Sequence, residues 1–109
     1  MEFRRINRGP NPERERSLDQ ARELTLKALN GISAEAYLFG SCVTGRARAF
    51  SDIDIGIMPR AELPADFFVR LSEAFEESDI PYNVDLVDLR RATPEFCARV
   101  RREGIVWKD

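Results

Sequence analysis

Aspartate and isoleucine alternate in the segment Asp52-Ile53-Asp54-Ile55-Gly56-Ile57. Successive residues of a β-strand point to opposite faces, so this pattern predicts a strand over 52–58 with isoleucine on one face and carboxylates on the other. Unpaired carboxylates are costly to bury inside a sheet. They are therefore expected where the strand reaches a cleft and divalent cations can compensate their charge.

A short apolar run, Glu35-Ala36-Tyr37-Leu38-Phe39, comes before this segment and is stopped by Gly40-Ser41, with ten residues between Ser41 and Asp52. The run predicts a buried strand that ends in a turn. Such a turn exposes backbone N–H groups and a hydroxyl, which suit a phosphate. Carboxylates facing a phosphate would repel it unless cations lie between them. The two motifs together indicate metal-assisted chemistry on a nucleotide.

A third carboxylate repeats the pattern further along the chain, in Val84-Asp85-Leu86-Val87-Asp88. Asp85 is the natural third metal ligand, whereas Asp88, at an odd offset, would face away from it on a regular strand. Each aspartate has a structural alternative: Asp52 could cap a loop, Asp54 could pair with an arginine, and Asp85 could lie at a solvated strand edge. The combination of all three with Gly-Ser favours the metal site.

The remaining patterns predict an α/β fold in which helices flank a small mixed sheet. Apolar residues at helical spacing predict helices over 17–30, 64–78 and 93–104, the last with a Thr93-Pro94 start. Further predictions are a helical turn within 41–45, a third strand over 83–89 and a short final strand over 105–107. Four phenylalanines at helical spacing are predicted to be core residues rather than base-stacking platforms: Phe67, Phe68, Phe75 and Phe96.

The length of 109 residues predicts one domain, over 17–109, after a flexible basic lead-in over 1–16. The lead-in arginines could form an arm for RNA or an acceptor, although a solvated terminus is the simpler interpretation. A net charge of −2 argues against nucleic acid as a direct ligand. No apolar run reaches membrane-spanning length, and no signal peptide is visible, so a cytoplasmic protein is expected.

Histidine is absent, which excludes Ser-His-Asp triads and most zinc sites and leaves carboxylates for proton and metal chemistry. Cys42 and Cys97 have no metal-ligand spacing and are interpreted as free thiols of a reducing compartment.

The spacing of Gly40-Ser41, Asp52-Ile53-Asp54 and Asp85 resembles the signature of the polymerase-β-like nucleotidyltransferases, specifically the minimal nucleotidyltransferases of HEPN/MNT toxin–antitoxin pairs. The resemblance covers roughly residues 18–107 and implies the polymerase-β-like fold and a two-metal mechanism. In that mechanism the three aspartates would be the catalytic residues and the ligands of two Mg²⁺ ions, and Asp85 would also be the base.

The resemblance further implies that Gly40, Ser41 and Arg46 bind the triphosphate of the donor, ATP by family habit. Arg48 is equally consistent with solvent exposure. Many relatives carry basic residues where this chain has Cys42 and Thr44, a departure that bears on how firmly the triphosphate is held.

The implied activity is transfer of AMP from ATP to a hydroxyl on a partner protein, with the chain as antitoxin to a helical HEPN-domain toxin. Two alternatives stay open. One is a non-catalytic binding module that neutralises the toxin by complex formation, and the other is a nucleotidyltransferase acting on a small-molecule hydroxyl. A homo-oligomer is also possible, because the edge strand of a small sheet often finds a partner.

Overall fold

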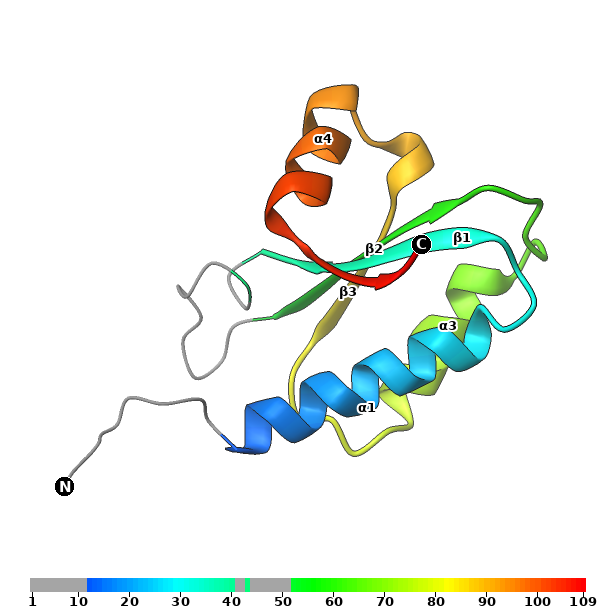
Figure 1. Cartoon of the computed structure of the whole chain (residues 1–109). Coiled ribbons are helices and arrows are strands. Elements are labelled where there is room, and N and C mark those ends of the chain that lie inside the picture. The colour runs from blue at the N-terminus through cyan, green and yellow to red at the C-terminus, as the bar shows by residue number, and fades with distance from the viewer. Residues whose placement is uncertain (1–11, 41–42, 44–51) are drawn as a thin grey trace, which may run out of the picture.

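Four strands form one mixed sheet in the order β3-β2-β1-β4 (Figure 1). They are β1 (Ala34–Phe39), β2 (Ile53–Pro59), β3 (Val84–Asp88) and β4 (Ile105–Lys108). Strand β1 pairs antiparallel with β2 and β4, whereas β2 and β3 are parallel. The structure is a computed structural model that describes residues 12–40, 43 and 52–109.

Helices cover both faces of this sheet. Figure 1 shows α1 (Pro12–Ala28) and α3 (Phe67–Glu76) on one face and α4 (Pro94–Glu103) on the other, after the 3₁₀ helix η1 (Leu89–Arg91). The parallel pairing of β2 and β3 requires a crossover, which α3 supplies. The predicted fold class, a small mixed sheet flanked by helices, is confirmed. No helix in the described part of the chain has the length and apolarity needed to cross a membrane.

The core divides into two clusters because successive residues of β1 face opposite sides of the sheet. Leu38 and the isoleucines of β2 pack against α1 and α3. Tyr37 points the other way and packs with a smaller cluster from η1 and α4: Leu89, Cys97 and Val100. The sheet is thus buried between two helical layers, and polar groups can reach solvent only near strand ends and edges.

The helix expected from Ser17 begins earlier, at Pro12. Proline suits the first helical position, and Glu13 and Glu15 place negative charge in the first turn, where the helix dipole favours it. The lead-in boundary at residue 16 stays a prediction, since residues 1–11 lie outside the described residues. The predicted turn over 41–45 also lies outside them, except for Val43, which is helical and donates its N–H to the Gly40 carbonyl at 3.0 Å.

Side-chain caps set the boundaries after β3. The Thr93 hydroxyl accepts the Phe96 N–H at 3.1 Å and Pro94 opens α4, which confirms the predicted helix start. The helix η1 was not predicted. It forms because Asp88 accepts the Arg90 N–H at 3.0 Å and so turns the chain at the end of β3.

The phenylalanines pack as core residues, as predicted. Phe67 and Phe75 are buried in the first cluster, and Phe68 lies edge-on to Phe67 with ring centroids 5.3 Å apart. Phe96 packs edge-on against Phe39 in the second cluster. Cys97 is a buried free thiol, whereas Cys42 lies outside the described residues.

Candidate active site

Two of the predicted site carboxylates lie side by side on neighbouring strands. Asp54 of β2 and Asp85 of β3 are register partners in the parallel pair. Side chains of directly paired residues point to the same face of a sheet, so both carboxylates project together. Asp54 is half-buried and Asp85 is exposed. The predicted pattern of a carboxylate repeated in two strands therefore corresponds to one shared position in space.

Gly40 brings the end of β1 against the same position. Phe39, the last residue of β1, is the register partner of Asp54, and Gly40 follows with a φ of +84°. A Cβ at Gly40 would overlap Oδ2 of Asp54. Only glycine therefore allows the backbone to turn here while lying against the carboxylate. The Gly-Ser motif and the aspartate motif thus meet through the antiparallel pairing of β1 and β2.

Asp52 lies just before β2 and is exposed. The pKa of Asp54 is raised above its ordinary value of 3.8, first by burial and then by the negative charges of Asp85 and Asp52. Each cause makes the ionised form of Asp54 less stable. Asp54 is therefore within electrostatic range of the other two predicted carboxylates, and a cation beside it would relieve this repulsion.

The donor chemistry of this group fits Mg²⁺, which prefers carboxylate oxygens and retains sites for water and phosphate. Within residues 12–40, 43 and 52–109, however, no three carboxylates or thiols are close enough to form a ready-made metal cluster. Asp85 and Asp52 can still raise the pKa of Asp54 without forming a metal cluster with it, because charges interact over longer distances than metal–ligand bonds. Asp52, Asp54 and Asp85 are the residues that would hold the cation.

A cavity of about 540 Å³ opens beside the carboxylates and is lined by both Asp52 and Asp85. Its other walls come from the end of α3, including Phe75, and from the segment that leads into β3, including Tyr82 and Asn83. Sequence reasoning did not assign these two residues to the site. Their position directly before the strand that carries Asp85 could have indicated that they lie near the site.

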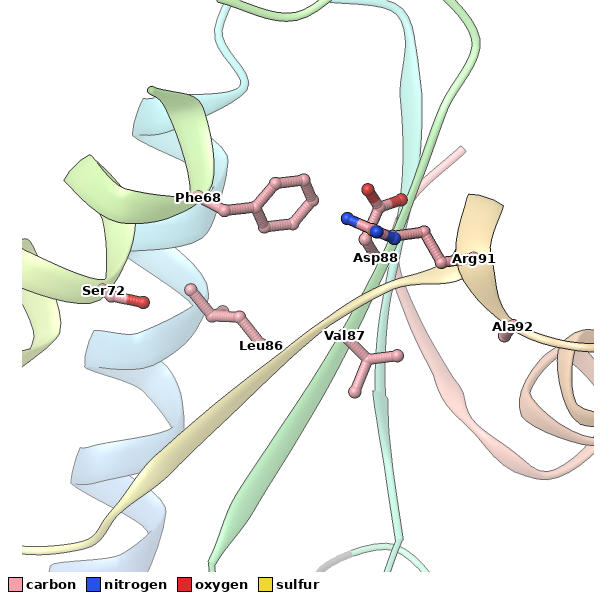
Figure 2. Close-up of a pocket in the computed structure, with 7 residues that line it drawn as sticks. All are labelled: Phe68, Ser72, Leu86, Val87, Asp88, Arg91 and Ala92. Atoms are coloured by element: carbon pink, nitrogen blue, oxygen red, sulfur yellow. The ribbon is translucent and has the colours of Figure 1, made fainter. Parts of the chain in front are cut away.

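A second cavity of about 480 Å³ lies at the opposite end of β3 (Figure 2). In Figure 2, Asp88 and Arg91 lie close together and the Phe68 ring faces them across the cavity. The Asp88 carboxylate is bound by the Arg90 guanidinium at 2.8 and 3.0 Å, which lowers its pKa. Asp88 is therefore a structural carboxylate, and its separation from Asp85 agrees with the predicted odd offset.

The structure thus brings together Gly40, Asp54 and Asp85, with Asp52 within electrostatic range. Ser41 and Arg46, predicted to bind the nucleotide, lie outside the described residues, as does Arg48. The catalytic, metal-binding and nucleotide-binding roles of all these residues stay predictions.

Comparison with known proteins identifies the family. Residues 25–108 match the model described as Polymerase beta, Nucleotidyltransferase. The chain belongs to this family. A Haemophilus influenzae protein named "Probable protein adenylyltransferase MntA" is 42% identical over 75 residues. The alignment covers 67% of this chain and 64% of that protein, so the chain spans less than two thirds of the relative's length.

Solved structures of toxin–antitoxin complexes share the fold. A toxin–antitoxin structure with AMP-PNP matches with a TM-score of 0.61 and 30% identity, over 79% of this chain and 71% of that one. The Shewanella oneidensis tri-AMPylated HEPN toxin in complex with its MNT antitoxin matches with a TM-score of 0.59 and 26% identity, over 85% and 70%. The resemblance to minimal nucleotidyltransferases is confirmed.

Proposed function

We propose that this chain transfers AMP from ATP to a hydroxyl on a HEPN-domain toxin and thereby acts as an antitoxin. The observation that carries the proposal is the register pairing of Asp54 with Asp85 beside the Gly40 turn. That arrangement places acidic oxygens and a close-approaching backbone around one position, as metal-assisted phosphoryl transfer requires. The reaction belongs in the cytoplasm, where thiols such as Cys97 stay reduced.

Each residue has a role in this proposal. Asp52, Asp54 and Asp85 would hold the Mg²⁺ ions, which would neutralise phosphate charge and lower the pKa of the acceptor hydroxyl. Gly40 lets the backbone approach the triphosphate, and Ser41 and Arg46 contact its phosphates. Asp85 accepts the acceptor proton as the oxygen attacks the α-phosphorus and pyrophosphate leaves.

The choice of donor and partner rests on the relatives. The name of the Haemophilus protein describes an adenylyltransferase, and the matched structures contain AMP-PNP in one case and an AMPylated HEPN toxin in another. These statements concern those proteins. They support ATP as donor and a HEPN toxin as acceptor here, because the region that matches the nucleotidyltransferase family model, residues 25–108, includes Gly40, Asp54 and Asp85.

The test combines the purified chain with its HEPN toxin, ATP and Mg²⁺ and follows the intact mass of the toxin and the release of pyrophosphate. We expect the toxin to gain AMP. Asp85→Asn should abolish the gain, because it removes the proposed base and metal ligand. Asp88→Asn is the matched control on the same strand and should retain activity, since Asp88 is bound to Arg90 away from the site.

The same experiment separates the alternatives. If wild-type chain and Asp85→Asn both neutralise the toxin and no AMP is transferred, the chain is a binding module and the catalytic proposal is wrong. If only added small-molecule hydroxyls gain AMP, the acceptor class is wrong.

A further inference from the structure

Strand β3 is an edge strand of the sheet that the described residues form. On its inner side, the Ile53 N–H donates to the Asn83 carbonyl at 2.9 Å. Backbone groups alternate in direction along a strand, so the N–H and C=O of Asp85 point toward β2 and those of Val84 and Leu86 point outward. Within residues 12–40, 43 and 52–109, these outward groups have no hydrogen-bond partner. The outer edge of β3 can therefore pair with an added strand.

The two cavities described above form one groove between this edge and α3. Ser72 of α3 lines both of them. Residues 80–85 line the cavity of about 540 Å³, and residues 86–88 line the cavity of about 480 Å³. In Figure 2, Leu86 points toward α3 and Val87 points away from it. An added strand would therefore find room along β3 for the side chains that it directs toward α3.

The pairing rules of a sheet place one residue of such a strand at the candidate active site. Directly paired residues point to the same face, as Asp54 and Asp85 do. The residue paired with Asp85 on the outer edge would therefore project on the face that carries both carboxylates. Its two neighbours would point to the opposite face, into the groove beside α3. An extended segment on β3 thus presents one side chain to the carboxylates and packs the next one into the groove.

The charges along β3 favour a foreign segment over a second copy of the chain. The strand contains Asp85 and Asp88 and no basic residue, so two β3 strands paired edge to edge would bring four carboxylates onto one ladder. The groove itself offers different contacts. Phe68 and Leu86 line it beside Asp88 and suit an apolar side chain, whereas Arg91 on η1 suits an acidic one.

We propose that the outer edge of β3 binds the acceptor protein as an extended segment, which adds a strand to the sheet and places its hydroxyl residue beside Asp85. An apolar residue next to the hydroxyl residue contacts Phe68 and Leu86, and an acidic residue further along lies near Arg91. Backbone hydrogen bonds supply affinity, and the groove supplies selectivity. This inference rests on the proposed nucleotidyltransferase function and states how its protein acceptor is recognised.

The first test measures hydrogen–deuterium exchange of single amides, by mass spectrometry with electron-transfer fragmentation, in the chain alone and in its complex with the HEPN toxin. The Val84 and Leu86 amides should exchange fast in the free chain and about tenfold or more slowly in the complex. The Asp85 amide points toward β2 and is the internal control. It should be protected in both states.

The second test compares Leu86→Pro with Leu86→Ala. Both variants lose the leucine packing, but only proline removes the outward N–H, and neither removes a hydrogen bond to β2. The KM for the toxin in AMP transfer should be about tenfold higher in Leu86→Pro than in Leu86→Ala, the effect of one lost backbone hydrogen bond. The kcat at saturating toxin should be similar. Circular dichroism checks the fold of both variants, and the exchange measurement decides if Leu86→Pro does not fold.

The outcomes separate this inference from the proposed function. A chain that AMPylates the toxin while the Val84 and Leu86 amides exchange at unchanged rates would overturn the inference and leave the function standing. An equal KM in the two folded variants would do the same. A dimer of the chain alone, seen by light scattering and lost in Leu86→Pro, would show that a second copy occupies the edge and that the inference is wrong. A toxin that never gains AMP would overturn both.

Discussion

At the scale of single residues, two glycines share a left-handed backbone conformation, but only one of them lies against a candidate site residue. Gly40 has a φ of +84° and leaves room for the Asp54 carboxylate. Gly31 has a similar φ of +80°, but a Cβ there would meet nothing within 4 Å. Both positions disfavour a side chain, and only Gly40 adds a collision with a candidate catalytic residue.

We therefore predict different outcomes for Gly40→Ala and Gly31→Ala. Gly31→Ala should cost about 1 kcal/mol of stability through its left-handed backbone and leave AMP transfer intact. Gly40→Ala should cost more, because the new Cβ displaces Asp54, and should abolish transfer. Thermal unfolding and the toxin mass assay measure the two effects. Full activity in Gly40→Ala would contradict the close contact between Gly40 and Asp54.

The charge of Asp54 predicts a conflict between stability and activity. Its folded pKa is raised from 3.8, so its contribution to stability is fully present below about pH 3.8 and is lost as the pH rises through the folded pKa. Without divalent cations, Asp54→Asn should be more stable than wild type at neutral pH, by less than about 1 kcal/mol because the group is partly solvated. It should be inactive. The difference in Tm should disappear as the pH falls to about 3, where Asp54 is protonated.

A constant difference in Tm across that pH range would show that the extra stability of Asp54→Asn comes from something other than the loss of the Asp54 charge. Added Mg²⁺ provides a second check, since it should stabilise wild type more than Asp54→Asn if Asp54 is a ligand.

At the scale of elements, some helix boundaries can be predicted from adjacent residues in the sequence and others cannot. The Thr93 cap and Pro94 lie next to each other in the sequence and mark the start of α4 directly. We predict that Thr93→Ala destabilises the protein by about 1 kcal/mol, because the Phe96 N–H loses its acceptor. Thr93→Ser should restore most of the loss, since it keeps the hydroxyl. Urea denaturation measures both, and equal stability of all three proteins would contradict a capping role.

The same pattern of a capping residue followed by proline explains why α1 begins earlier than predicted. In the sequence, Asn11-Pro12-Glu13 has the same form as Thr93-Pro94-Glu95, so a helix start at Pro12 was visible there, although the flexible lead-in was predicted to extend to residue 16. The 3₁₀ helix η1 was harder to predict from the sequence. It depends on the Asp88 side chain accepting the Arg90 N–H, a local bond that no apolar pattern reveals.

At the scale of the whole molecule, Glu35 joins elements that are distant in sequence. Its carboxylate on β1 receives the Tyr37 hydroxyl at 2.6 Å and Nε of Arg101 on α4 at 3.1 Å, and it lies 3.3 Å from Arg60 after β2. These partners, the Tyr37 hydrogen bond first, lower the pKa of Glu35 despite its burial. The network therefore ties α4 to the strand that precedes the Gly40 turn.

Glu35→Gln should destabilise the protein by about 1–2 kcal/mol at neutral pH, because three groups lose a charged acceptor. A lowered pKa stabilises the fold above the unfolded value of about 4.5, and this contribution is lost as the pH falls through the folded pKa. The stability difference should therefore shrink in acid. Glu73→Gln, an exposed carboxylate on α3, is the control and should change little at any pH. Guanidinium denaturation at several pH values measures both variants, and equal losses would contradict the network.

The site itself was predictable only in part. The strands carrying Asp54 and Asp85 were predicted from their alternation, because burial on one face repeats along the local sequence. Their adjacency was an expectation from the family resemblance, since strand order is decided by the α3 crossover and not by either strand alone. The cavity lined by Tyr82 was not predictable, because it requires the end of α3 to stand beside the start of β3.

The register pairing of Asp54 with Asp85 has one further consequence. Hydrogen-bonded strands lie about 4.8 Å apart whatever their side chains. The backbone pairing of β2 and β3 therefore sets how far apart the residues that carry the two carboxylates lie. The two cations of such reactions lie about 3.5–4 Å apart, a span that this spacing can serve. The backbone pairing of β2 and β3 thus sets the distance between the two carboxylates, and substitutions in the helices should leave it unchanged. A one-residue slip of β3, in contrast, would turn Asp85 to the opposite face.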